Sequence, residues 1–347
     1  MLGAILGENP STNQIQPPPR EPLPYRRIGV GGHYRRTLLL LLLGLLPQAI
    51  AQQTDKVALL PTVRSTPVRV VTTVNFVTDL VQQVGGQRVQ VEGLMGAGVD
   101  PHLYKASAGD VRKLQQAHLI FYSGLYLEGK MMELLERLPR AIAISDAIPR
   151  ERLIQPAGGF EGQYTYDPHI WFDVSLWKLT VARVRDALSK VDPAGASSYR
   201  ANAEAYTRRL NQLDAFIQRQ VAQVPPRQRV LITAHDAFAY FGRRYGLEVR
   251  GLQGVSTLSE AGTRDIQQLA DFIVQRRIRA IFVESSVPRR AIDAVVAAVR
   301  ARGGNVAVGG QLFSDSAGSP GTPEGTYVGM MEHNTRTIVN GLLGGLP

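Results

Sequence analysis

Between residues 68 and 343 the chain alternates β-branched runs with stretches of helical apolar spacing, and this alternation constrains its fold most. Short apolar runs bounded by turn residues are typical of buried strands. Strands separated by helices indicate parallel sheets. The expected strands are 68–74, 89–92, 119–122, 141–144, 230–233, 248–250, 278–283 and 305–308. The main expected helices are 76–84, 107–116, 174–190, 197–224, 263–275, 288–302 and 326–343.

One expected helix is much longer than the others. Residues 197–224 contain few helix breakers, and Pro225-Pro226 stops the helix. About 28 residues at 1.5 Å each give a length of about 40 Å, enough to brace two lobes. We predict two α/β lobes, each a parallel sheet flanked by helices, joined by one long rigid helix. The expected parts are a leader at 1–51, a linker at 52–67, a first lobe at 68–192, the bridging helix at 193–225 and a second lobe at 226–347.

The apolar run at 38–46 has the setting of a secretory signal peptide. Arg35-Arg36 precede it and Ala49-Ile50-Ala51 follow it, in the order basic region, apolar region and cleavage site. The run is too short to span a bilayer, which needs about 20 residues, and a buried core helix is the other interpretation. The chain has no cysteine, so disulfides and a lipid anchor on an N-terminal cysteine are excluded. We expect a periplasmic or secreted protein, unless the apolar run is retained as an anchor.

The formal net charge of +10 does not indicate nucleic-acid binding. Five arginines against two glutamates give the segment 1–51 a charge of +3, which leaves +7 on the rest. There the basic residues are interspersed with acidic ones and form no cluster with interleaved aromatic residues. We expect a solvated basic surface and no nucleic-acid partner.

Histidines are the side chains that most suggest chemistry. His102 and His235 each follow an expected strand, and His169 ends a loop just before a helix. Asp315 lies in a loop after another strand. Loops at the carboxyl ends of strands line the ligand crevice of open α/β sheets, so each lobe would supply two of these side chains. Spacing alone leaves a shared metal site and unrelated loop histidines equally open.

Three imidazoles and one carboxylate form a complete shell for a four-coordinate transition metal. Imidazole suits zinc, copper, iron and nickel, whereas carboxylate oxygens suit manganese, magnesium and calcium. A shell without an open position favours binding over catalysis, and the chain has no H-E-x-x-H, G-x-S-x-G or G-x-x-x-x-G-K-[ST] pattern. His118, at a helix-to-strand junction, and His333, on the last helix, are interpreted as surface or hydrogen-bonded residues.

Several long motifs resemble those of the solute-binding proteins of zinc/manganese ABC importers, a family often described as adhesin-type lipoproteins. They are Asp100-Pro101-His102-Leu103-Tyr104, Asp167-Pro168-His169-Ile170-Trp171, Thr233-Ala234-His235-Asp236-Ala237-Phe238, Gly251-Leu252-Gln253-Gly254-Val255-Ser256, Leu312-Phe313-Ser314-Asp315 and Gly325-Thr326-Tyr327-Val328-Gly329-Met330. The resemblance implies a monomer, not an enzyme, that carries one Zn²⁺ or Mn²⁺ ion to a membrane permease. It implies four metal ligands, His102, His169, His235 and Asp315, and the two-lobed fold predicted above.

Two departures from the family pattern bear on anchoring and on the metal. Many members carry a lipidated cysteine, which this chain lacks. Manganese-type members often have a carboxylate where this chain has His235, whereas zinc-only members have a histidine-rich loop that is absent from 128–163. The mixture resembles a subgroup that binds both metals. Glu284 could orient a ligand or bond only to backbone, and a zinc-dependent hydrolase and a surface adhesin are the alternative functions.

Overall fold

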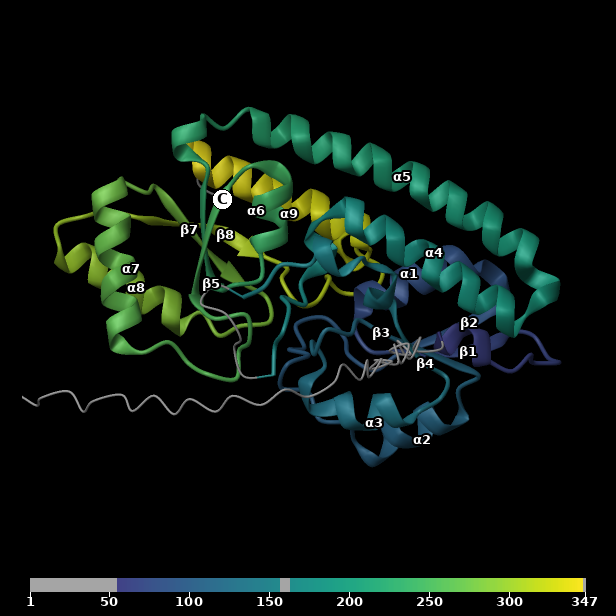
Figure 1. Cartoon of the computed structure of the whole chain (residues 1–347). Coiled ribbons are helices and arrows are strands. Elements are labelled where there is room, and N and C mark those ends of the chain that lie inside the picture. Colours follow the sequence, from purple (N-terminus) through teal and green to yellow (C-terminus); the bar gives the residue numbers. More distant parts are fainter. Residues whose placement is uncertain (1–54, 157–162, 346–347) are drawn as a thin grey trace, which may run out of the picture. The chain divides into compact units, whose positions relative to one another are not determined.

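Four parallel strands form the sheet of the N-terminal lobe, in the order β2-β1-β3-β4 (Figure 1). The computed structural model describes residues 55–156 and 163–345. The strands are β1 Val68–Thr72, β2 Val89–Gly93, β3 Leu119–Tyr122 and β4 Ala141–Ala143. Val70 of β1 pairs with Val91 on one side and with Leu119 on the other. Every residue of β3 and β4 is buried, as expected for parallel strands covered on both faces.

The helices of this lobe begin and end at signals that the sequence carries. They are α1 Asn75–Gly85, α2 Ala108–Gln116, α3 Met132–Arg137 and α4 Val174–Val191. Gly86 ends α1 with a φ of 54°, a conformation that glycine adopts without steric cost. Ser107 and Asp110 form a capping box at the start of α2, which fixes where the loop carrying His102 ends.

The C-terminal lobe also contains only parallel pairings among its described strands, but they form two sheets. The strands are β5 Val230–His235, β6 Glu248–Gln253, β7 Ala280–Glu284 and β8 Ala307–Leu312. β5 pairs with β6 and β7 pairs with β8, while β5 lies beside β7. The expected strand 230–233 is therefore too short by two residues, and His235 belongs to the strand and not to the loop after it.

Four helices accompany these strands (Figure 1). They are α6 Ala239–Tyr245, α7 Thr263–Arg276, α8 Arg290–Ala301 and α9 Tyr327–Leu343. The short helix α6 is absent from the sequence-based expectations. α7 and α8 pack against each other, whereas α9 packs against β8 and against the long helix described next.

The long helix α5, Ala196–Ala222, lies along both lobes (Figure 1). It packs against α1 and α4 of the N-terminal lobe and against α9 of the C-terminal lobe. Its 27 residues correspond to about 40 Å of helix. The predicted α/β fold with parallel sheets and one long bracing helix is therefore confirmed.

The lobes share a continuous apolar core. The larger of two hydrophobic clusters contains the N-terminal sheet together with residues of α6 and α9 from the other lobe. Phe172 stacks on Phe238 with ring centroids 4.2 Å apart, and Trp177 stacks on Tyr327 at 4.7 Å. Separating the lobes along this face would expose large aromatic surfaces to water, which is unfavourable. The part of the interface formed by this core therefore resists wide opening.

Two predictions concern the N-terminal segment. The predicted leader at 1–51, with its apolar run and cleavage site, lies outside the described residues. Within the predicted linker a short 3-10 helix, Lys56–Leu59, precedes the buried Leu60. In the part of the chain that the structure describes, no helix combines the length and the apolar character needed to cross a membrane.

Candidate metal centre

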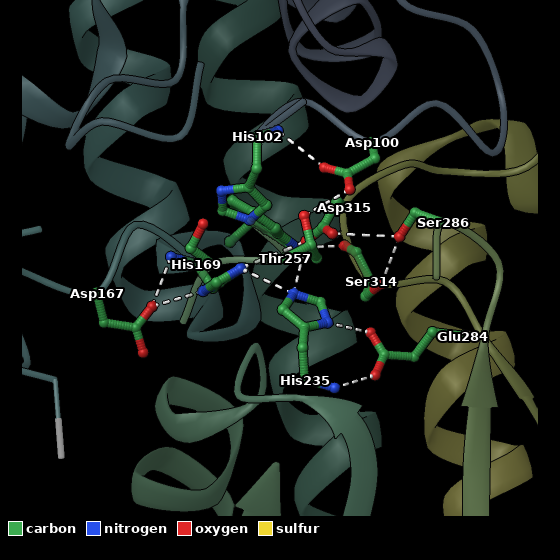
Figure 2. Close-up of polar contacts among 12 residues, drawn as sticks. Asp100, His102, Asp167, His169, His235, Thr257, Glu284, Ser286, Ser314 and Asp315 are labelled. Carbon is green, nitrogen blue, oxygen red and sulfur yellow. Dashed lines mark hydrogen bonds and ion pairs between the residues drawn. The ribbon is translucent and has the colours of Figure 1, made fainter. Parts of the chain in front are cut away.

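Three imidazoles and one carboxylate meet between the lobes (Figure 2). One nitrogen from each of three histidines and one oxygen of Asp315 lie within 4.8 Å of one another. The four residues are His102, His169, His235 and Asp315. All four have an exposed fraction of 0%. The structure thus brings together every side chain that the sequence analysis assigned to the site.

These side chains come from loops and from the ends of regular elements. His102 lies in the loop between β2 and α2, and His169 immediately precedes a 3-10 helix, Ile170–Phe172. His235 is the last residue of β5, and Asp315 follows β8 by three residues. The carboxyl ends of strands from both lobes therefore face one point, as expected for a ligand crevice in α/β proteins.

Each imidazole has a different group beside its Nδ1 atom. Asp167 Oδ1 lies 2.7 Å from His169 Nδ1, and Glu284 Oε2 lies 2.6 Å from His235 Nδ1. The phenol oxygen of Tyr164 lies 2.9 Å from His102 Nδ1. A partner on Nδ1 fixes the orientation of the ring and leaves Nε2 for a metal ion.

The Nε2 atoms of two imidazoles converge on the carboxylate of Asp315. Asp315 Oδ1 lies 3.4 Å from His169 Nε2 and 3.4 Å from His235 Nε2, and these two nitrogens are 3.3 Å apart. The other oxygen, Oδ2, accepts a hydrogen bond of 3.2 Å from Ser286 Oγ. Ser286 thus orients the carboxylate and leaves Oδ1 directed at the imidazoles (Figure 2).

Within the described residues, the buried side-chain atoms of this cluster that lack a hydrogen-bond partner include His102 Nε2 and Asp315 Oδ1. A buried polar atom without a partner is unfavourable and is rare in folded proteins. A cation bound between these atoms would satisfy both. The donor set of three nitrogens and one carboxylate oxygen fits a divalent transition metal.

Burial and the neighbouring charges shift the pKa values of the titratable side chains in the site. Burial lowers the pKa of His102 to about 3. Burial would also lower the pKa of His169, but the carboxylates of Asp167 and Asp315 outweigh it and raise this pKa to about 9. For His235 the effect of burial is likewise exceeded by Asp315 and Glu284, which raise the pKa well above its usual value. The imidazoles in turn hold the pKa of Asp315 well below its usual value although burial opposes this.

Comparison with known proteins identifies the family of this chain. Residues 70–341 match the family described as zinc-uptake complex component A, periplasmic (ZnuA). The chain belongs to this family. Its ZnuA-family relatives include the manganese-binding lipoprotein MntA of Bacillus subtilis, 47% identical over 79% of this chain and 89% of that protein. The zinc-binding protein TroA of Treponema pallidum is 48% identical over 79% of this chain and 88% of that protein.

A solved structure of a ZnuA-family relative confirms the fold. The periplasmic zinc-binding protein TroA of Treponema pallidum superposes with a TM-score of 0.76 and 48% identity. The match covers 79% of this chain and 98% of that chain. The resemblance drawn from the sequence motifs is therefore confirmed.

The structure also resolves the position of Glu284 in this ZnuA-family chain, which the sequence left open. Glu284 bonds to backbone, because its Oε1 accepts a hydrogen bond of 2.9 Å from the amide of His235. It also forms an ion pair with the ring of the same residue, as described above. The carboxylate of Glu284 therefore contacts both the backbone and the ring of His235.

Residues near the site that were not assigned a role from the sequence include Asp100, Asp167, Tyr164 and Ser286. The two aspartates precede histidines in the repeated Asp-Pro-His tripeptide, a signal that the sequence carries. No comparable pattern marks Tyr164. His118 and His333 do not belong to the cluster: the amide of Arg69 donates to His118, and His333 bonds the carbonyl of Gln311.

Proposed function

We propose that this chain captures one divalent transition metal ion, Zn²⁺ or Mn²⁺, outside the cytoplasm and delivers it to the permease of an ABC importer. His102, His169, His235 and Asp315 are the proposed ligands. The observation that supports this most directly is the convergence of three imidazole nitrogens and one carboxylate oxygen, all fully buried, within 4.8 Å. The ion is the cargo of the protein and not a cofactor of a reaction.

The relatives support both the cargo and the location. MntA of Bacillus subtilis is named a manganese-binding lipoprotein, and TroA of Treponema pallidum is named a periplasmic zinc-binding protein. We propose a periplasmic or secreted location for this chain. It acts as a monomer and has no catalytic role. The alternative functions, a zinc-dependent hydrolase and a surface adhesin, are not supported by the comparisons.

Metal binding itself provides the first test. Equilibrium dialysis with elemental analysis should find one Zn²⁺ or Mn²⁺ per chain, and His235→Ala should abolish tight binding. His333→Ala is the matched control, because this histidine lies outside the cluster, and it should bind as the wild type does. Thermal stability of the wild type should rise with metal concentration, since the ion binds only the folded state. A wild-type chain that binds neither ion overturns the proposal.

The cargo and the delivery need separate measurements. Zn²⁺ binds nitrogen and oxygen sites more tightly than Mn²⁺ in general, so affinity in solution alone does not identify the cargo. Elemental analysis of the protein purified from its native compartment identifies it. Cells that lack this chain should take up that metal more slowly, and the wild-type gene but not His235→Ala should restore uptake.

A further inference from the structure

Asp100 connects one proposed ligand to the opposite lobe. Its Oδ1 accepts a hydrogen bond of 2.8 Å from the backbone amide of His102. Its Oδ2 accepts a hydrogen bond of 2.6 Å from the hydroxyl of Thr257, which follows β6 in the C-terminal lobe (Figure 2). The carboxylate of Asp100 therefore bonds both to the backbone of His102 and to Thr257 of the other lobe.

The other ligands are supported differently. Glu284 and Ser286 support His235 and Asp315 from within the same lobe. His169 is supported by Asp167, only two residues away. His102 differs from the other proposed ligands: its backbone amide is bonded to Asp100, and Asp100 is in turn bonded to the other lobe.

The segments that carry His102 and His169 also differ in how they are attached to the C-terminal lobe. The His169 segment is fixed by buried contacts: the Trp171 indole donates to the carbonyl of Ser314, and Phe172 stacks on Phe238. The His102 loop is attached by half-buried polar contacts, namely the Thr257 bond and a bond of 2.8 Å from the amide of Gly98 to Ser316 Oγ. Polar contacts near solvent break more easily than a buried aromatic core, so the His102 loop is the part of the site that can open.

We propose that Thr257 is a positioning residue for metal retention: through Asp100 its hydroxyl holds His102 against the ion, and loss of this bond lets the His102 loop move away and the ion leave. This inference rests on the proposed function. Thr257 contacts no ligand side chain, and its effect passes through Asp100 to the backbone of His102. We therefore expect the hydrogen bond between Thr257 and Asp100 to affect the rate of metal release. It does not change which atoms bind the metal.

The test is the rate at which the full chain, loaded with Zn²⁺, loses its ion to an excess of chelator in a stopped-flow instrument. Thr257→Val keeps the shape of the side chain but removes the hydroxyl, and release should accelerate about tenfold, as is typical when a group supporting a ligand is removed. Thr257→Ser keeps the hydroxyl and should release at the wild-type rate. The melting temperature of metal-free Thr257→Val should remain that of the wild type, a result that general destabilisation would not give.

Thr207→Val is the matched control. Thr207 is also half-buried, but its hydroxyl donates to the carbonyl of Ala203 within α5, far from the site along the helix. This variant should release Zn²⁺ at the wild-type rate. If Thr257→Val and Thr207→Val accelerate Zn²⁺ release equally, the inference is overturned, because the effect would then not be specific to Thr257.

A double-mutant cycle tests whether Thr257 acts through Asp100. Asp100→Ala removes both bonds and should accelerate release more than Thr257→Val does. In the Asp100→Ala background, Thr257→Val should add no further acceleration. Additive effects, or wild-type release from Thr257→Val alone, overturn the inference while the proposed function stands. A wild-type chain that binds no Zn²⁺ or Mn²⁺ instead overturns the proposed function.

Discussion

The tripeptide Asp-Pro-His occurs at 100–102 and again at 167–169, and the two copies share a backbone geometry but differ in their surroundings. In each copy Oδ1 of the aspartate accepts a hydrogen bond of 2.8 Å from the amide of the histidine. In the second copy the same carboxylate also lies against the histidine ring, whereas in the first the ring meets the phenol of Tyr164. Both copies therefore share the hydrogen bond between aspartate and histidine amide, but they differ in the group beside the imidazole.

The electrostatic consequence of this difference is large. His169 has a carboxylate on its Nδ1, and its pKa is raised to about 9 although burial opposes the shift. His102 has a neutral phenol there, and burial lowers its pKa to about 3. Hydrogen bonds to an ionised group are roughly twice as strong as those between neutral groups. Of these two proposed ligands, His169 is therefore the more firmly held and His102 the more weakly held.

The largest effect should follow from deleting each imidazole in turn. We expect His169→Ala to lose more metal affinity than His102→Ala, because the carboxylate-supported ring is the better donor. Both losses should exceed the roughly 10- to 100-fold that is typical for removing a group that only supports a ligand. Competition with a chelator of known affinity measures both variants, with His118→Ala as the control. A greater loss from His102→Ala would reverse the ranking of the two copies.

Replacing the carboxylate of the second copy should have an intermediate and pH-dependent effect. In metal-free protein below about pH 9, His169 carries a proton that the metal must displace, so wild-type affinity should rise with pH up to about 9. Asp167→Asn removes the negative charge and lowers the pKa of His169, so its affinity should rise less steeply with pH up to about 9 than that of the wild type. The variant should bind about tenfold more weakly at high pH, and the difference should narrow on acidification.

Chelator competition at several pH values between about 6 and 9 checks this prediction, since that range lies between the usual and the raised pKa of the ring. Glu92→Gln, at an exposed carboxylate of β2, is the control for loss of a negative charge and should follow the wild-type curve. If metal affinity changes with pH in the same way in the wild type and in Asp167→Asn, then Asp167 does not set the pKa of His169.

Much of the arrangement behind this comparison was predictable from the sequence. Alternation of β-branched runs with helices predicted the parallel strands, and the expected helix 107–116 agrees with α2 and its N-cap Ser107. Strand ends pointed to His102, His235 and Asp315, because the carboxyl ends of parallel strands share one edge of a sheet. The family motifs implied the full set of proposed ligands, including His169. The expected end of β5 was wrong: Ala234 and His235 continue the strand, since His235 still pairs with Gln253 of β6.

The partners of the imidazoles were not predictable in the same way. Tyr164 lies 62 positions from His102, and Thr257 lies 157 positions from Asp100. Such pairs depend on how the two lobes pack and leave no periodic pattern in the chain. Asp167 is the exception, because it stands two residues before its histidine, and the repeated tripeptide marked it.

Replacing the phenol of the first copy should have the smallest effect of the three. Tyr164→Phe removes one hydroxyl from a ring that is otherwise buried and keeps the edge contact with Tyr126. A hydrogen bond between neutral groups contributes about 1 kcal/mol, which corresponds to a loss of affinity of about fivefold. His102 is neutral throughout the range from pH 6 to 9, because its pKa is lowered to about 3. The loss in Tyr164→Phe should therefore be the same at every pH in that range, in contrast to Asp167→Asn, and the same chelator competition measures it. If the loss varied with pH or exceeded that of Asp167→Asn, charge beside the ring would not be what distinguishes the two copies.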